Sequence, residues 1–214
     1  LQHQGVDYLA VAFADEGVLL RERGITMPVV VLNADADSFD QMIANRLEPE
    51  IYSFRSLADF ADAVSHAGET RYPVHIKLDT GMHRLGFMEG EIGRLCEVLP
   101  TLPAVKVASV FSHLNCADMP EEDAYTREQI ARYDRMSAAV AASLPYSVIR
   151  HTANSAAIER FPEARFDMCR LGLGLYGFGW EHNAGLRPVS ALKTRIVQIK
   201  RLEAGDAVGY GRAG

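Results

Sequence analysis

The sequence predicts an α/β protein whose parallel sheet curls into an incomplete eight-stranded β/α barrel of the TIM type. Short apolar runs alternate with amphipathic stretches from residue 7 to residue 176. Two of the amphipathic stretches are followed by Gly24 and Gly68, and glycine is the residue that most often ends a helix. Strands that alternate with helices in this way are typical of parallel sheets with right-handed crossovers.

Seven segments are predicted to be strands because they are short, apolar and rich in β-branched or aromatic residues. In chain order they are residues 7–12, 28–33, 50–53, 74–79, 105–113, 146–152 and 168–176. Predicted helices occupy residues 14–23, 38–46, 56–67 and 91–99. A long helix opens near Asp118 and Glu121, whose spacing is that of a capping box, and a short helix begins at Asn154-Ser155.

A closed barrel of this kind has eight strands, so one strand is unaccounted for. Residues 1–5 resemble the end of a helix followed by its terminal glycine. We therefore expect the unaccounted strand to be the first, so that the chain carries strands 2–8.

The pattern changes after Trp180. Residues 186–202 alternate apolar and polar side chains as strands do, and residues 203–206 form a predicted turn with no helical pattern behind it. We therefore expect a barrel domain over residues 1–180 and the start of a second, β-rich domain over residues 181–214.

Composition is that of an ordinary globular protein, with 48% apolar and 23% charged residues among 214 and a formal net charge of -6. A mildly acidic chain without a clustered basic stripe argues against a nucleic-acid partner. No apolar run is long enough to span a membrane, and no signal-peptide pattern opens the chain, so a cytoplasmic protein is the simplest expectation. The three cysteines lack the spacing of a zinc site and are expected to be buried.

The strand over residues 74–79 is the most informative segment. Its apolar side chains share one face, while His75, Lys77 and Asp79 share the other. A glycine-bounded loop with Arg84 follows the carboxyl end of this strand. An ionisable face followed by an arginine loop favours a site for an anion.

Other polar residues fall at the carboxyl ends of predicted strands, where the active sites of β/α barrels lie. His113 ends one strand, Asn154 and Ser155 follow the next, and Arg170 lies on the last. Each has a simpler interpretation: His113 as a core histidine, Asn154 or Ser155 as a helix cap, and Arg170 as a partner of Asp79. Their common position supports a site more than any one of them does.

The last predicted strand has two different faces. Gly172 and Gly174 share the face of Arg170 and leave room for a flat ligand close to the backbone. The opposite face is expected to pack on helices through Cys169, Leu171, Leu173 and Leu175.

Five motifs together resemble the bacterial alanine racemases, which are pyridoxal-phosphate enzymes with a β/α barrel and a smaller β-rich domain. They are HIKLDTGMHRLGF at residues 75–87, FSHLNCAD at 111–118, HTANSAA at 151–157, RLGLGLYG at 170–177 and VGYG at 208–211. They occur in the family's order through nearly the whole chain.

The resemblance implies a role for each matching residue. His113 would lie against the pyridine ring of the cofactor, and Arg170 would face the ring nitrogen and disfavour its protonation. The phosphate would be bound by Asn154, Ser155, Gly172 and the backbone of Leu173.

The resemblance also implies how the substrate and the catalytic groups are arranged. Arg84 would meet the phenolic oxygen of the cofactor and the carboxylate of the substrate. Lys77 matches a lysine that many members carry in carboxylated form, with the carbamate pairing with Arg84. Tyr210 matches the catalytic tyrosine, which in the family serves the site of the partner subunit, so a homodimer is expected.

The second catalytic base of the family is the lysine that holds the cofactor, in a strand ahead of anything present here. The chain contains only Lys77, Lys106, Lys193 and Lys200, and none matches that position. We therefore expect covalent attachment of pyridoxal 5'-phosphate, and activity, to be impossible for these residues alone.

The parent protein is expected to interconvert L- and D-alanine and so supply D-alanine for peptidoglycan. Alternatives that share parts of the pattern are a serine racemase, an amino-acid decarboxylase of the same barrel type, or a non-catalytic pyridoxal-phosphate-binding barrel.

Overall fold

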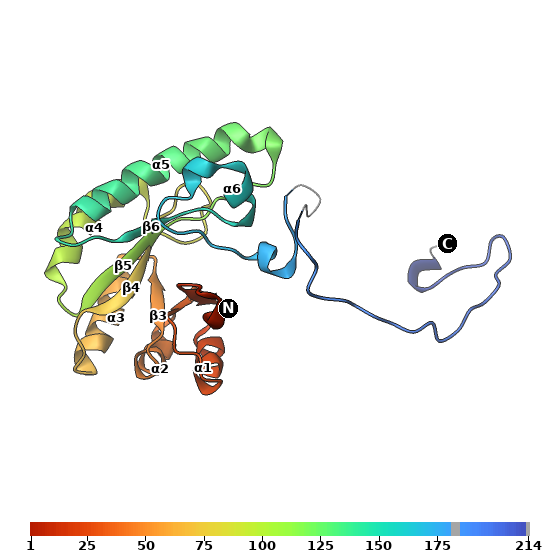
Figure 1. Ribbon diagram of the computed structural model, residues 1–214, viewed down its shortest axis with the longest axis horizontal. Helices are drawn as coiled ribbons and strands as arrows, with labels where there is room; N and C mark the ends of the chain where they lie inside the picture. Colours follow the sequence, from red (N-terminus) through yellow and green to blue (C-terminus); the bar gives the residue numbers. More distant parts are fainter. Residues whose placement is uncertain (181–184, 213–214) are drawn as a thin grey trace.

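Six parallel strands form one curled sheet in the computed structural model, which describes residues 1–180 and 185–212 (Figure 1). The strands lie side by side in chain order, so each connection crosses to the neighbouring strand. They are β1 (Leu9–Val11), β2 (Val29–Val31), β3 (Glu48–Ile51), β4 (Tyr72–Lys77), β5 (Val105–Phe111) and β6 (Ile149–His151). β1 and β6 are the edges of this half-barrel, which confirms the predicted incomplete barrel.

Of the six α-helices in the described residues, the first five cover the outer face of the sheet, and the last lies beyond the carboxyl end of β6 (Figure 1). They are α1 (Ala14–Glu22), α2 (Phe39–Ala44), α3 (Phe54–His66), α4 (Ile92–Val98), α5 (Asp123–Ala142) and α6 (Ser155–Arg160). Helix α3 shows why they form here: the Ser53 hydroxyl accepts from the Ser56 N–H at 3.1 Å at its start, and Leu57, Phe60 and Val64 make its buried stripe. None of the described helices is long and apolar enough to cross a membrane.

The two faces of β4 separate as predicted. Val74 and Ile76 are fully buried in the apolar core between the sheet and the helices. His75 and Lys77 are buried on the inner, concave face with polar neighbours. The strand therefore carries the core on one side and ionisable groups on the other.

A bulge in β5 sets what faces the interior. Val74 pairs with Val107, but the next residue, His75, pairs with Ser109, so one extra residue lies in β5. The extra residue shifts the alternation, because Val107 and Val110 belong to the outer core while the hydroxyl of Ser109 lies 2.6 Å from His75 Nδ1. The bulge thus places a hydroxyl where regular pairing would place Ala108.

The predicted strand over residues 168–176 is wrong. The Arg170 N–H donates to the Ala153 carbonyl at 2.9 Å, but the Gly172 and Gly174 N–H groups donate to the Ser155 hydroxyl, and a 3-10 helix, η7, covers Leu173–Tyr176. Because a side chain takes the N–H groups that a strand ladder needs, the segment turns. The expected packing on helices is also wrong, since Leu171, Leu173 and Leu175 are 49%, 68% and 39% exposed.

The cysteine prediction is wrong too. Cys169 is exposed, and Cys96 and Cys116 are only partly buried.

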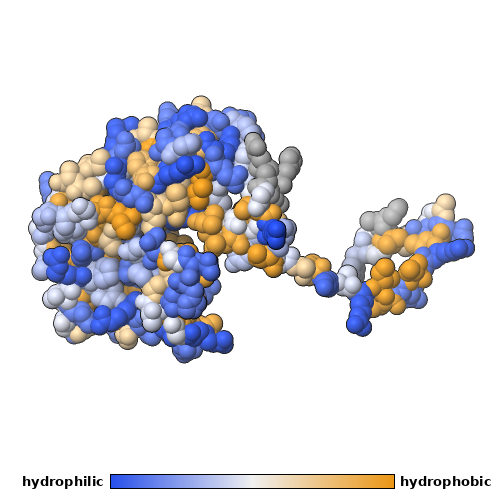
Figure 2. All heavy atoms as spheres, viewed as in Figure 1, coloured by the Kyte–Doolittle hydropathy of each residue, from blue (hydrophilic) through white to orange (hydrophobic). Residues whose placement is uncertain are grey.

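Residues 185–212 extend away from the barrel as an arm (Figure 1). Within the described residues, one contact between the arm and the barrel is a 3.3 Å hydrogen bond from the Val189 N–H to the Tyr176 carbonyl. Figure 2 shows hydrophobic residues interspersed with hydrophilic ones along the arm, and Leu192 and Val197 are almost fully exposed. The expected strands do not form within residues 185–212, because a single extended segment needs a neighbour to pair with. The domain division at residue 180 stays a prediction, since residues 181–184 lie outside the described chain.

Candidate active site

A cavity of about 730 Å³ opens on the concave side of the sheet, at the carboxyl ends of the strands. It collects nearly all of the residues that the sequence singled out, although they come from four separate stretches of the chain. These lining residues are Lys77, Arg84, His113, Asn154, Ser155, Arg170, Gly172 and Leu173. Tyr210 is absent from the lining: it lies on the arm and is fully exposed.

Lys77 lies at the floor of the cavity, 7% exposed. Its Nζ is 3.8 Å from Oε1 of Glu50 and 4.5 Å from the centre of the Phe111 ring, and both contacts favour the charged amine. Burial nevertheless lowers the pKa of Lys77 to about 8, with Arg170 and Arg84 adding to the effect and Glu50 opposing it. Burial raises the pKa of Glu50, while Lys77 opposes this shift.

Arg170 is held by carbonyl oxygens rather than by a carboxylate. Its Nη2 donates to the carbonyls of Ser112 at 2.7 Å and Thr152 at 3.1 Å, and its Nη1 donates to Nδ1 of His151 at 2.9 Å. Burial lowers the pKa of Arg170 to about 10, which still leaves it charged at neutral pH.

Asp79 is not the partner of Arg170. One of its oxygens accepts from the N–H groups of Gly81 and His83, at 2.9 and 3.1 Å, and the carboxylate therefore shapes its own loop. The other oxygen lies 3.5 Å from the His83 ring.

A buried hydrogen-bonded chain runs from Arg170 into the interior. His151 Nε2 lies 2.9 Å from the Ser109 hydroxyl, which lies 2.6 Å from His75 Nδ1, and His75 Nε2 lies 2.7 Å from Glu48. Burial lowers the pKa of His151 well below its usual value, and Arg170 adds to this shift, so the ring is neutral. This series of hydrogen bonds joins the cavity to the buried carboxylate of Glu48 on β3.

His113 presents a neutral ring to the cavity. Burial lowers its pKa to about 3, with Arg170 the next contributor. Its Nδ1 is 3.3 Å from Nη2 of Arg170, so the ring is anchored beside the guanidinium. A neutral, anchored imidazole can lie against a flat aromatic ligand.

The start of α6 forms a polar corner of the same cavity. Asn154 caps the helix, because its Oδ1 accepts from the Ala157 N–H at 3.0 Å, and its Nδ2 donates to the Leu114 carbonyl at 3.1 Å. The Ser155 hydroxyl accepts from the Gly172 and Gly174 N–H groups at 3.0 and 3.2 Å. A Cβ built at Gly172 would meet only that hydroxyl, at 3.9 Å, so space is open beside the backbone. The predicted cap role of Asn154 is therefore confirmed, and it coexists with a place on the cavity wall.

The loop after β4 brings Arg84 to the cavity mouth, where its side chain is exposed. Helix α5 braces the loop: the Tyr125 hydroxyl donates to the Gly81 carbonyl at 2.8 Å, and Arg132 donates to the Thr80 carbonyl at 3.1 Å. A fixed loop with an exposed guanidinium suits the binding of an anion that enters from solvent.

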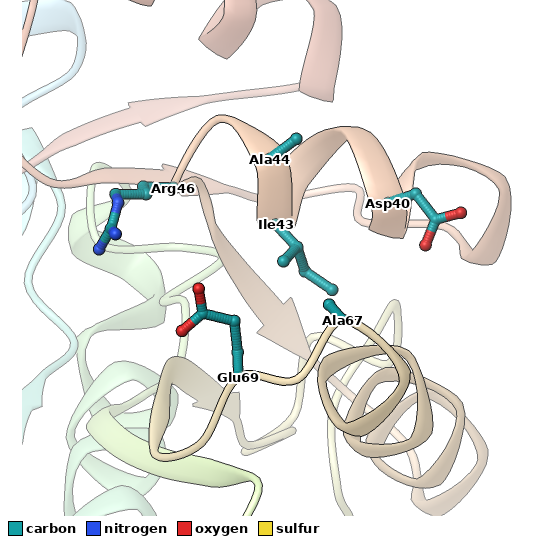
Figure 3. Close-up of a pocket in the computed structure, with 6 residues that line it drawn as sticks. All are labelled: Asp40, Ile43, Ala44, Arg46, Ala67 and Glu69. Carbon is teal, nitrogen blue, oxygen red and sulfur yellow. The ribbon is translucent and has the colours of Figure 1, made fainter.

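A second hollow, of about 440 Å³, lies near the amino-terminal ends of β3 and β4, between α2 and the segment after α3 (Figure 3). The side chains of Arg46 and Glu69 flank it, and both residues are exposed. This hollow is at the end of the strands opposite to the cavity and contains none of the residues singled out above.

Sequence reasoning missed several residues of the site. Glu50 was assigned only to a strand, and Glu48, Ser109 and His151 were given no role. The available signal for Glu50 was its place at the start of the strand predicted over residues 50–53, whereas Glu48 lay outside that predicted strand, which the structure begins two residues earlier. The contacts between strands could not be inferred from one strand alone.

Fold and cavity together define a β/α-barrel protein with a cationic, partly aromatic site at the carboxyl ends of its strands. Residues 1–179 match the family described as alanine racemase, N-terminal domain, and the chain belongs to this family.

Relatives and solved structures agree. The chain is 37% identical to the alanine racemases of Symbiobacterium thermophilum and Desulfovibrio desulfuricans, over 97% of its own length and 56% and 57% of theirs. It is similar to the alanine racemase structure of Clostridium difficile 630, with a TM-score of 0.85 and 34% identity over 99% of this chain and 57% of the other. The structure from D-cycloserine-producing Streptomyces lavendulae gives a TM-score of 0.88 and 28% identity, with 99% and 57% coverage. The chain thus spans about half the length of these relatives.

Proposed function

We propose that this chain is the cofactor-binding part of an alanine racemase that interconverts L- and D-alanine with pyridoxal 5'-phosphate. Membership of the family supports the proposal, and the observation that carries it is the convergence of Arg170, His113 and the Ser155 corner on one cavity. When bound, the cofactor withdraws electrons from the Cα of an amino acid joined to it, and the protein provides orientation and control of protons.

The residues present fit the cofactor. His113 offers a neutral ring for stacking, beside Arg170, whose positive charge would keep a pyridine nitrogen unprotonated. Ser155, with the open space beside Gly172 and the adjoining Leu173 and Asn154, suits a phosphate group. These assignments follow the roles that the resemblance to the alanine racemases implies.

Substrate binding falls to Arg84 in this proposal. Its exposed guanidinium at the cavity mouth would pair with the alanine carboxylate and orient the Cα. Tyr210 would exchange a proton with the Cα in the site of a partner subunit, so the proposal includes a homodimer of the parent protein. A position on an exposed arm away from its own cavity is compatible with that role.

Whether these 214 residues can be active by themselves depends on the positions of their four lysines. Lys77 lines the cavity, whereas Lys106, Lys193 and Lys200 are exposed and outside its lining. Since Lys77 matches a different position of the family, we propose that these residues bind the cofactor reversibly and do not racemise alanine. In the parent, D-alanine for peptidoglycan would be made in the cytoplasm.

The test is titration of the chain with pyridoxal 5'-phosphate, followed by borohydride reduction, mass spectrometry and an assay of alanine racemisation. We expect absorbance changes on binding, no reduced adduct on any lysine and no turnover. Arg170→Ala should weaken binding at least about tenfold, whereas Arg55→Ala, at an exposed position on α3, should not.

Lack of binding by the unmodified chain would contradict the cofactor assignment, and a reduced lysine adduct together with turnover would contradict the inactivity. Profiling the parent protein with alanine, serine and other amino acids separates an alanine racemase from a serine racemase or a decarboxylase.

A further inference from the structure

Glu50 and Lys77 form a buried ion pair at the floor of the cavity. They lie on adjacent strands, and the register pairs Glu50 with His75, which shares the inner face with Lys77. Glu50 is 2% exposed and Lys77 7%, and their charged atoms are 3.8 Å apart. The pair is therefore shielded from solvent and from the screening that weakens surface ion pairs.

The charges around the cavity give this carboxylate a specific task. Lys77, Arg84 and Arg170 are three cationic side chains in the cavity wall. The acidic residues of the wall are Glu50 and Asp118, and Asp118 is exposed. Asp79, two residues after Lys77 in sequence, already accepts hydrogen bonds from the N–H groups of its own loop. Glu50 is thus the buried carboxylate that faces the lysine.

We propose that Glu50 is a positioning residue that holds Lys77 as an unmodified ammonium ion, in place of the carboxylated lysine that the resemblance implies. Phe111 supports the same state, because its ring lies 4.5 Å from the ammonium. The cavity then keeps one fixed anion of its own, independent of dissolved carbon dioxide.

The chemistry of lysine carboxylation explains why Glu50 opposes it. The lone pair of a neutral amine attacks the carbon of carbon dioxide, so that an N–C bond forms while one C=O π bond breaks and leaves its electron pair on oxygen. The nitrogen then loses a proton to water. Glu50 favours the protonated amine, which has no lone pair to attack with. The product would place a second anion beside Glu50, and like charges that are close together and shielded from solvent repel each other.

The experiment labels the lysine side chains with ¹³C at Cε and follows them by NMR against pH, with ¹³C-bicarbonate present. The chain offers internal controls, since Lys106, Lys193 and Lys200 are exposed and outside the cavity lining, so a change confined to the Lys77 resonance is specific to the cavity. For the unmodified sequence we expect Lys77 to titrate as an amine, with no carbamate carbonyl resonance.

The variant Glu50→Gln should lower the pKa of Lys77 by about one unit or more, a tenfold change in proton affinity. Glu50→Asp should restore part of that loss, and Glu69→Gln, at an exposed position outside the cavity, should leave the pKa unchanged. A merely structural role of Glu50 would not move this pKa selectively.

A bicarbonate-derived carbamate on Lys77 of the unmodified chain would overturn the proposal, and so would an unchanged Lys77 pKa in Glu50→Gln. If Glu50→Gln does not fold, the bicarbonate measurement on the unmodified chain decides alone. No cofactor is used, so failure here is separate from failure of the proposed racemase function.

Discussion

Nη1 of Arg170 lies 2.9 Å from Nδ1 of His151, and this contact fixes which nitrogen of the histidine carries its proton. An arginine can only donate, so Nδ1 must accept and the proton lies on Nε2. Nε2 then donates to Ser109, 2.9 Å away, and Ser109 can pass its own O–H to His75, which faces Glu48. The orientation of a cavity arginine therefore depends on groups deep inside the half-barrel.

Ser109→Ala should destabilise the protein by about 1 to 3 kcal/mol, because it leaves two buried ring nitrogens without their hydroxyl partner. Urea unfolding measures the loss. Ser65→Ala is the control: Ser65 is exposed on α3, and its removal should change the free energy of unfolding by about 0.5 kcal/mol or less. If the two substitutions had equal effects, the buried hydrogen bonds of Ser109 would contribute nothing to stability.

The stability of the chain should fall as pH drops below about 6.5, the usual pKa of an unfolded histidine. Burial lowers the pKa of His113 to about 3 and that of His151 well below its usual value, so in this range the unfolded state binds protons that the folded state does not. Each group then removes up to about 1.4 kcal/mol per pH unit. Unfolding free energies measured by urea at a series of pH values test this expectation.

Two variants assign the pH effect. His113→Phe keeps a flat ring without a titrating group, so the slope of stability against pH should become shallower. His66→Phe, at an exposed position at the end of α3, should leave the slope unchanged. A slope that is the same in all three proteins would exclude His113 as a source.

Gly86→Ala should destabilise the protein by on the order of 3 kcal/mol. Gly86 has a φ of 128°, and a Cβ there would lie 2.6 Å from the backbone nitrogen of Asp79. Gly90→Ala is the matched control, because nothing lies within 4 Å of its added Cβ. Thermal unfolding of both variants gives the comparison, and a neutral Gly86→Ala would mean that the Arg84 loop adapts freely.

Ser155→Ala should weaken binding of pyridoxal 5'-phosphate by about tenfold and leave binding of pyridoxal nearly unchanged. The hydroxyl orders the Gly172 and Gly174 N–H groups in the proposed phosphate corner, and pyridoxal has no phosphate to place there. Absorbance titrations with both compounds provide the ratio. Equal losses for the two compounds would place the phosphate elsewhere.

Much of the architecture follows from the sequence itself. Alternating strands and helices, the two faces of β4 and the cap at Asn154 are local features, since each depends on residues a few positions apart. The carboxyl ends of parallel strands meet at one edge, so the sequence alone predicts that His113, Asn154, Ser155 and Arg170 lie together. The structure confirms that grouping in a single cavity.

Tertiary structure decided what depends on neighbours that are distant in sequence. The bulge in β5 brings Ser109 to His75, and the Ser155 hydroxyl takes the N–H groups that a strand over residues 168–176 would have needed. The register of β3 against β4 brings Glu50 to Lys77. Periodicity reports which face a side chain occupies, whereas the hydrogen-bond and charge partners on that face are set by strand register and by competition for backbone groups, which only the folded chain determines.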